Sequence, residues 1–154
     1  MNRREFLVVA AMPQYAAGPL ETFSSEEARS VEALCDQIIP ADDVAGAKEA
    51  GVLFYIDRQL AGPLHRFASA YHENLPRLAA SCKQSKGRDF TDLPFSQQTE
   101  FLKQLEAPNL KEFFALVVDH TMQGFYGSPK HGGNRGEVSW DSLGIRDVME
   151  GHKH

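Results

Sequence analysis

Apolar side chains recur at helical spacing from Ser24 to Gly124, and this periodicity is the strongest constraint on what the chain can fold into. Recurrence at positions i, i+3, i+4 and i+7 places apolar residues on one face of a helix, whereas a half-buried strand needs alternation in twos. The sequence shows no sustained alternation, and β-branched residues are sparse outside Val117-Val118. The pattern therefore predicts an all-α fold, an irregular bundle of about five helices.

Residues that start and stop helices divide the periodic region. Ser24 and Glu27 have the spacing of a capping box, which predicts the start of a first helix that ends at Pro40. A second helix is expected over residues 50–60, before a Gly-Pro pair. The third is expected over 64–86. Pro76 lies inside it and is expected to bend or split it, because proline lacks a backbone donor.

The last two helices are predicted from the same kinds of signal. A fourth helix follows Pro94 and is expected to stop near Pro108. Asn109 has the side chain of an N-cap for the fifth helix. Gly124 stands in the position where glycine commonly ends a helix, and we expect the fifth helix to stop there.

Length and charge restrict the class of protein. The chain has 154 residues, 24% of them charged, and a formal net charge of -5, all of which suit one soluble globular domain. It lacks the basic face that phosphate-backbone binding requires, so nucleic acid is not expected as a partner. The longest apolar run, Phe6 to Met12, is far below the roughly 18 residues of a membrane span.

The N-terminus has the order of a twin-arginine export signal. Arg3 and Arg4 precede Phe6, Leu7 and a short apolar run. Such signals direct folded proteins across the membrane, so we expect a periplasmic location or one on the outer face of the inner membrane. A processing site is expected near Ala16-Ala17-Gly18. The predicted organisation is a leader over 1–22, a helical domain over 23–146 and a tail over 147–154.

Half of the 12 glycines fall between Gly124 and Gly144, interleaved with aromatic residues. Glycine-rich chain forms no regular element by itself, and large rings gain free energy only when they are buried. We therefore predict an ordered C-terminal loop used to dock a partner, while packing of the same rings on the chain's own core remains the alternative. The predicted docking residues are Phe125, Tyr126, Pro129, His131, Gly132, Gly133, Asn134 and Trp140.

Motifs for catalysis, phosphate binding or covalent haem attachment are not found in the sequence. Asp42 and Asp43 form a carboxylate pair that suits either a cation or a solvated turn, and the turn is the commoner case. The histidines lack the spacing of metal ligands, so structural roles are favoured for them too. Cys35 and Cys82 fall on apolar helix faces. Buried thiols are favoured over a disulfide between them, and a link to another chain is a third alternative.

The order of several short motifs resembles the gluconate 2-dehydrogenase subunit 3 family. The motifs run over about residues 24–146 and comprise 38–43, 46–47, 50–52, 54–57, Phe90, Phe113-Phe114, 121–129, 131–134, Trp140 and Gly144. The resemblance implies a small subunit that contains no cofactor of its own. Its implied partner is a larger FAD-dependent flavoprotein of the glucose-methanol-choline (GMC) oxidoreductase type, often joined by a cytochrome c subunit that carries haem c.

Two functions therefore remain at the level of the sequence. The first is an accessory, non-catalytic subunit that docks onto, stabilises and helps export a sugar or alcohol dehydrogenase. The second is a small helical enzyme that binds a metal or ligand through Asp42, Asp43, His120 or His131.

Overall fold

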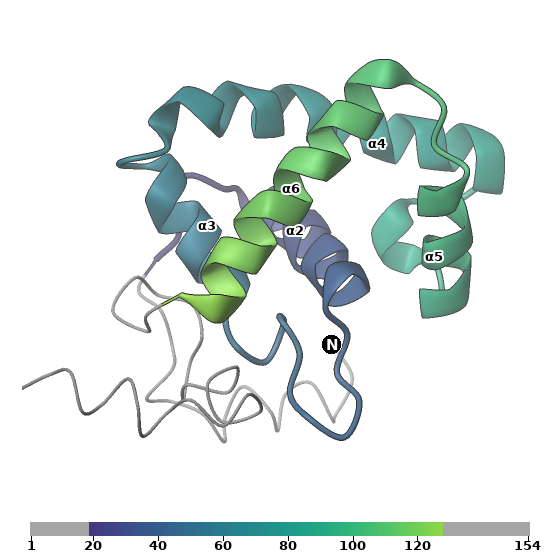
Figure 1. Ribbon diagram of the computed structural model, residues 1–154. Helices are drawn as coiled ribbons and strands as arrows, with labels where there is room; N and C mark the ends of the chain where they lie inside the picture. The colour runs from purple at the N-terminus through teal and green to yellow at the C-terminus, as the bar shows by residue number, and fades with distance from the viewer. Residues whose placement is uncertain (1–18, 128–154) are drawn as a thin grey trace, which may run out of the picture.

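The computed structural model describes residues 19–127, and within this range it is all-α, with no β-strand. The predicted fold class is confirmed, and the predicted glycine- and aromatic-rich loop after Gly127 lies outside the described residues. The described part has five α-helices and two short 3-10 helices (Figure 1). These are α2 Ser25–Ile38, α3 Val52–Leu60, η2 His65–Phe67, α4 Ala68–Lys86, η3 Phe90–Asp92, α5 Phe95–Lys103 and α6 Pro108–Tyr126.

Helices α2 and α6 lie at the centre of the packing, because each of them contacts the other and also α3 and α4. Helix α6 crosses in front of α2 in Figure 1, and α5 lies to one side, where it contacts α2. The core between these helices is apolar and closely filled. Its fully buried members include Val31 and Leu34 of α2, Ile56 of α3, Tyr71 of α4 and Val117 of α6.

The first predicted helix is confirmed with its cap. The Glu27 N–H donates to Ser24 Oγ (3.1 Å), and the Ser24 N–H donates to Glu27 Oε1 (3.0 Å). These reciprocal bonds satisfy backbone donors that a helix start leaves without partners. The helix ends at Ile38, just ahead of Pro40, and buries the face predicted from its spacing.

Helix α4 runs through Pro76 as one element, so the predicted split does not occur. Pro76 is exposed, which leaves its helix turn on the solvent side. The predicted third helix is interrupted earlier instead, where residues 65–67 form a 3-10 turn after Leu64. At its other end Gly87 adopts a left-handed conformation (φ 76°) and its N–H donates to the Lys83 carbonyl (2.9 Å), a common way for glycine to end a helix.

Helix α6 differs from prediction at both ends. It begins at Pro108 with Ala107 as N-cap, so the Asn109 side chain is not the cap. Proline suits a first helical position because its missing N–H would have no partner there. The helix also continues through Gly124 to Tyr126, whereas the sequence predicted an end at Gly124. The reason is tertiary: at Gly124 α6 packs so closely on Tyr55 and Val52 of α3 that there is no room for a Cβ.

The two cysteines are free and buried, which confirms the thiol alternative over a disulfide between Cys35 and Cys82. Cys35 Sγ lies 3.5 Å from Thr121 Oγ1 in the core between α2 and α6. Burial raises the pKa of the Cys35 thiol to about 12, so the group stays protonated at neutral pH. Both residues therefore act as small hydrophobic side chains.

Candidate docking surface

The C-terminal end of α6 packs closely on α3. A Cβ added at Gly124 would lie 2.6 Å from Tyr55 Cδ1 and 3.0 Å from Val52 Cγ1, so only glycine permits this approach of the two helices. One residue earlier, the Tyr55 hydroxyl donates to Gln123 Oε1 (3.3 Å). The last turn of α6 is therefore positioned by α3 before the chain enters the predicted docking stretch.

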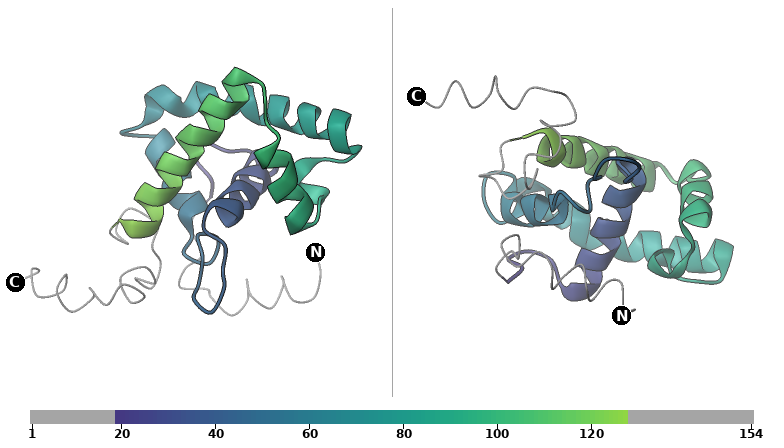
Figure 2. Two further views of the ribbon diagram at one scale, coloured as in Figure 1. Left: turned by 45° about the vertical axis from the view of Figure 1, so that its right-hand side comes forward. Right: turned by 90° about the horizontal axis from the view of Figure 1, so that it is seen from below.

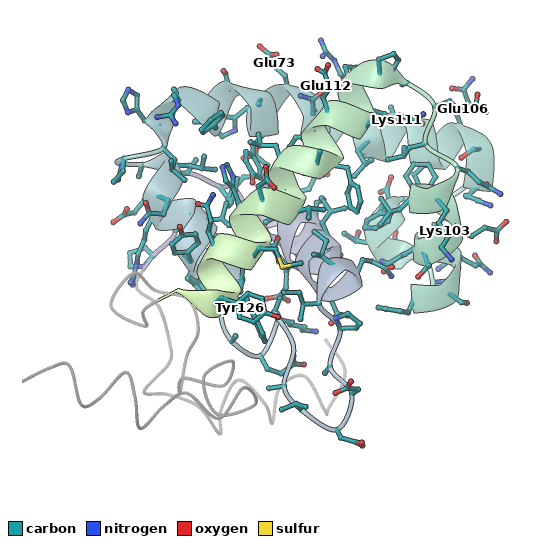
Figure 3. All side chains as sticks on the ribbon, viewed as in Figure 1. Glu73, Lys103, Glu106, Lys111, Glu112 and Tyr126 are labelled. Carbon is teal, nitrogen blue, oxygen red and sulfur yellow. The ribbon has the colours of Figure 1, made fainter. Side chains whose placement is uncertain are left out.

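Two large apolar side chains are exposed at this end, Met122 (41%) and Tyr126 (46%). Figure 3 shows Tyr126 at the end of the α6 ribbon. We call Met122 and Tyr126 the α6-end surface. Phe125 was predicted as a docking residue; its side chain is only 5% exposed and joins the core, in line with the alternative that these rings pack on the chain's own core. Its ring instead supports Tyr126 edge-to-face at 4.9 Å.

The connection between α2 and α3 projects at the same end of the molecule as the α6 terminus (Figure 2). Its base is closed by the bond from the Ala47 N–H to the Ile39 carbonyl (2.9 Å). Gly46 allows this closure, because a Cβ there would lie 2.4 Å from the Ile39 oxygen. At the tip Val44 is 48% exposed.

Asp42 and Asp43 are exposed residues of this connection. Asp42 Oδ1 accepts from the Val44 N–H (2.9 Å), and the Asp42 N–H donates to the Val44 carbonyl (3.1 Å). This is the local side-chain to backbone bonding by which aspartate forms turns. The turn interpretation of the pair is therefore confirmed for Asp42.

His120 lies in the core, whereas the turn that contains Asp42 and Asp43 is exposed to solvent. His120 is 3% exposed, and its Nδ1 lies 2.8 Å from the Tyr71 hydroxyl. The two rings are stacked, and Phe67 meets the imidazole edge-on at 5.3 Å. Burial lowers the pKa of His120, which favours the neutral ring. The structural role favoured for this histidine is confirmed.

The residues of the alternative enzyme are not gathered into one site within the part of the chain that is described. His120 is buried while Asp42 and Asp43 are exposed, and His131 lies outside the described residues. Among residues 19–127, no three His, Cys, Asp or Glu side chains converge as metal ligands would. The predicted export signal and most of the predicted docking stretch lie outside residues 19–127. Outside the described range are Arg3, Arg4, Phe6, Leu7, Pro129, His131, Gly132, Gly133, Asn134 and Trp140.

A second feature of the surface was not predicted, a groove of about 270 Å³ between α2, α5 and α6. Its lining is Gln37, Thr99, Leu102, Lys103 and Phe114. Gln37 joins two helices there, because its Nε2 donates to the Phe95 carbonyl (3.0 Å) and its Oε1 accepts from the Thr99 hydroxyl (2.7 Å). Phe95, at the start of α5, is 46% exposed. Spacing alone could not show that these three helices meet.

Sequence reasoning also missed Asp57, a buried acid of α3. The signal was available, because Asp57 follows Ile56 in a helix whose other inward residues are apolar. A charged residue at the edge of an apolar stripe is usually solvated, and only the fold shows that this one is 2% exposed.

Comparison with known families identifies the chain. The family model for gluconate 2-dehydrogenase subunit 3 matches residues 25–146, which is most of the sequence. The chain belongs to this family. The match begins at the first residue of α2 and extends beyond the described end of α6. No curated protein and no solved structure matches the chain. Within residues 19–127, none of the helices is long and apolar enough to cross a membrane.

Proposed function

We propose that this chain is a non-catalytic small subunit that docks onto and stabilises a larger FAD-dependent dehydrogenase of the GMC type. The observation that carries the proposal is membership of the gluconate 2-dehydrogenase subunit 3 family over residues 25–146. FAD belongs to the catalytic partner in this proposal, and haem c to a further cytochrome subunit. The twin-arginine signal of this chain, with Arg3 and Arg4, would take the assembled pair to the periplasm.

The internal chemistry of the domain supports a scaffold role. Three of the polar side chains described above hold the fold: His120 bonds Tyr71, Asp42 forms a turn, and Gln37 joins α2 to α5. A subunit that stabilises a partner needs a preformed surface, because ordering a surface during binding costs affinity. The last turn of α6, fixed on α3 through Gly124, is such a surface.

We assign docking to the α6-end surface and to the residues that follow it. Met122 and Tyr126 expose apolar area directly before Pro129, His131 and Trp140 of the predicted docking stretch. Tyrosine and tryptophan are among the residue types that most often anchor interfaces, since their rings bury much area and their O–H and N–H groups can hydrogen-bond to the partner. Phe125 contributes by supporting Tyr126 from beneath.

The test is co-purification from the native host with a matched pair of variants. Tyr126→Ser removes a ring that is 46% exposed at the end of α6, and Phe95→Ser removes an equally exposed ring at the start of α5. The tagged wild-type chain is expected to bring down a protein with flavin absorbance that oxidises a sugar or alcohol. We expect Tyr126→Ser to weaken this complex by about 30-fold, the effect of an anchor worth about 2 kcal/mol.

Phe95→Ser is expected to retain the flavoprotein. Equal retention by both variants would remove the α6-end surface from the interface. A chain that co-purifies without any flavoprotein, or that oxidises the substrate by itself, would overturn the proposed function.

Export is tested with the signal. Replacing Arg3 and Arg4 together by lysine preserves charge but removes the guanidinium pair of the signal. We expect dehydrogenase activity to move from the periplasm to the cytoplasm together with this chain. Activity that still reaches the periplasm would show that the partner is exported without it.

A further inference from the structure

Asp57 is a buried carboxylate whose bonds all lead to the segment that precedes α2. Its Oδ2 accepts from the Glu21 N–H (2.7 Å), and its Oδ1 accepts from the N–H groups of Thr22 and Phe23 (2.9 Å each). Its own main-chain carbonyl accepts from the Thr22 hydroxyl (2.8 Å). Bonds from backbone donors to an ionised carboxylate are among the stronger kinds in proteins, and here the acceptor is 2% exposed.

The segment bound by Asp57 is also held by apolar contacts. Phe23 is 5% exposed, and its ring lies 5.5 Å from that of Tyr71. Leu20 packs against the edge of the core. Directly afterwards Ser24 caps α2. We call residues 20–23 the N-terminal strap; it is an extension of the folded body that begins before the family match at residue 25.

The strap limits where a protease can remove the leader, because a protease must bind its substrate as a locally unfolded segment. Three consecutive N–H groups of the strap are engaged by one side chain that lies 34 to 36 residues away in the sequence. Freeing any peptide bond of the strap therefore requires those bonds to break and Phe23 to leave the core. Residues 24–27 are closed to a protease as well, since they form the capping box of α2.

We propose that Asp57 sets the downstream limit of leader removal: cleavage occurs only before Leu20, and the N-terminal strap stays with the mature protein. This limit lies before residue 22, the predicted end of the leader, and after Ala16-Ala17-Gly18, the expected processing site. Asp57 acts as a positioning residue, and it can act only after α3 has packed beside the start of α2. The link to a removable leader rests on the proposed export function. The hydrogen bonds from Asp57 to the strap, which we call the latch, do not depend on that function.

A protease that cuts after glutamate tests the latch on the purified full chain, because Glu21–Thr22 is a bond within the strap. In the folded wild-type chain we expect this bond to be resistant. Asp57→Asn keeps the shape of the side chain but turns an amide group, with its own donors, toward the strap N–H groups. We expect cleavage after Glu21 to accelerate by about tenfold or more, as measured by fragment mass over time.

Two controls separate the latch from general loss of stability. Asp43→Asn removes an exposed acid of the α2–α3 connection and is expected to leave the rate unchanged. Cleavage after Glu73, within α4, reports on unfolding of the whole domain. An Asp57→Asn chain in which Glu21 and Glu73 are cut with the same acceleration, or in which Glu21 is cut no faster than in the wild type, would overturn the proposal.

The boundary is then read from the protein as the host makes it. The mass of the periplasmic chain is expected to correspond to an N-terminus at or before Leu20. An N-terminus at Glu21 or beyond would contradict the inference. Should the chain never reach the periplasm, the export function fails, while the protease result still decides whether Asp57 holds the strap.

Discussion

The substitution Gly124→Ala tests whether the close approach of α6 to α3 determines the course of the last helix. Gly124 is buried, and the new methyl group would lie 2.6 Å from Tyr55 Cδ1, well inside van der Waals contact. It would also meet Tyr55 Cγ and Val52 Cγ1 at 3.0 Å. Neither neighbour can yield easily, because Tyr55 is 9% exposed and Val52 is fully buried.

Two effects of opposite sign decide how much Gly124→Ala changes the free energy of unfolding. Alanine is favoured over glycine inside a helix by about 1 kcal/mol, which stabilises the variant. Overpacking of a filled core costs about 1–3 kcal/mol, and a contact this short belongs in the upper part of that range. We therefore expect the free energy of unfolding to fall by about 1–2 kcal/mol, and Tm to fall by about 3–6 °C.

Urea unfolding and thermal melting followed by circular dichroism measure both quantities. Gly62→Ala is the matched control, because a Cβ there meets only the Arg58 carbonyl oxygen at 3.6 Å, an ordinary contact. We expect it to change stability by no more than about 0.5 kcal/mol. If Gly124→Ala instead gained the full helix preference of about 1 kcal/mol, the two helices would not be in tight contact, and the account of α6 given above would be refuted.

Three further outcomes follow from the described residues. Cys35 and Cys82 are free, and burial raises the pKa of both thiols. A thiol reagent is therefore expected to label neither cysteine in the folded protein and both in denaturant without reductant. If the denatured chain did not react, the two cysteines would form a disulfide. Burial lowers the pKa of His120, so the unfolded chain binds more protons below about pH 6.5 and stability is lost as pH falls through that value. His120→Gln is expected to reduce the loss of unfolding free energy between neutral and acid pH, as measured by urea titrations at successive pH values. If the loss is unchanged, it is caused by other groups. Ser24→Ala removes the bond to the Glu27 N–H and is expected to cost about 1 kcal/mol in the same assay, with no loss expected if the cap were solvated.

The candidate site was only partly accessible to sequence reasoning. Tyr126 was predicted as a docking residue and its side chain is exposed, and Asp42 was expected in a turn and forms one. Phe125 is adjacent to Tyr126 in the same glycine-rich context, yet its ring enters the core. Two neighbouring residues of a helix point in different directions, and which direction is inward depends on where α3 lies. The burial of Asp57 was not predicted for the same reason, because its hydrogen-bond partners are 34 to 36 residues away in the sequence.

What the sequence alone determined is what depends on neighbours within a few residues. The capping box of Ser24, the stop before Pro40 and the left-handed end at Gly87 form from bonds closed inside one turn of chain. The helical class follows from the apolar period in the same way. Only the tertiary structure decided that α4 runs through Pro76, that α6 runs through Gly124, and that Asp57 holds the strap. Each of these depends on which faces meet across the core, and contacts between distant segments leave no regular spacing in a single sequence.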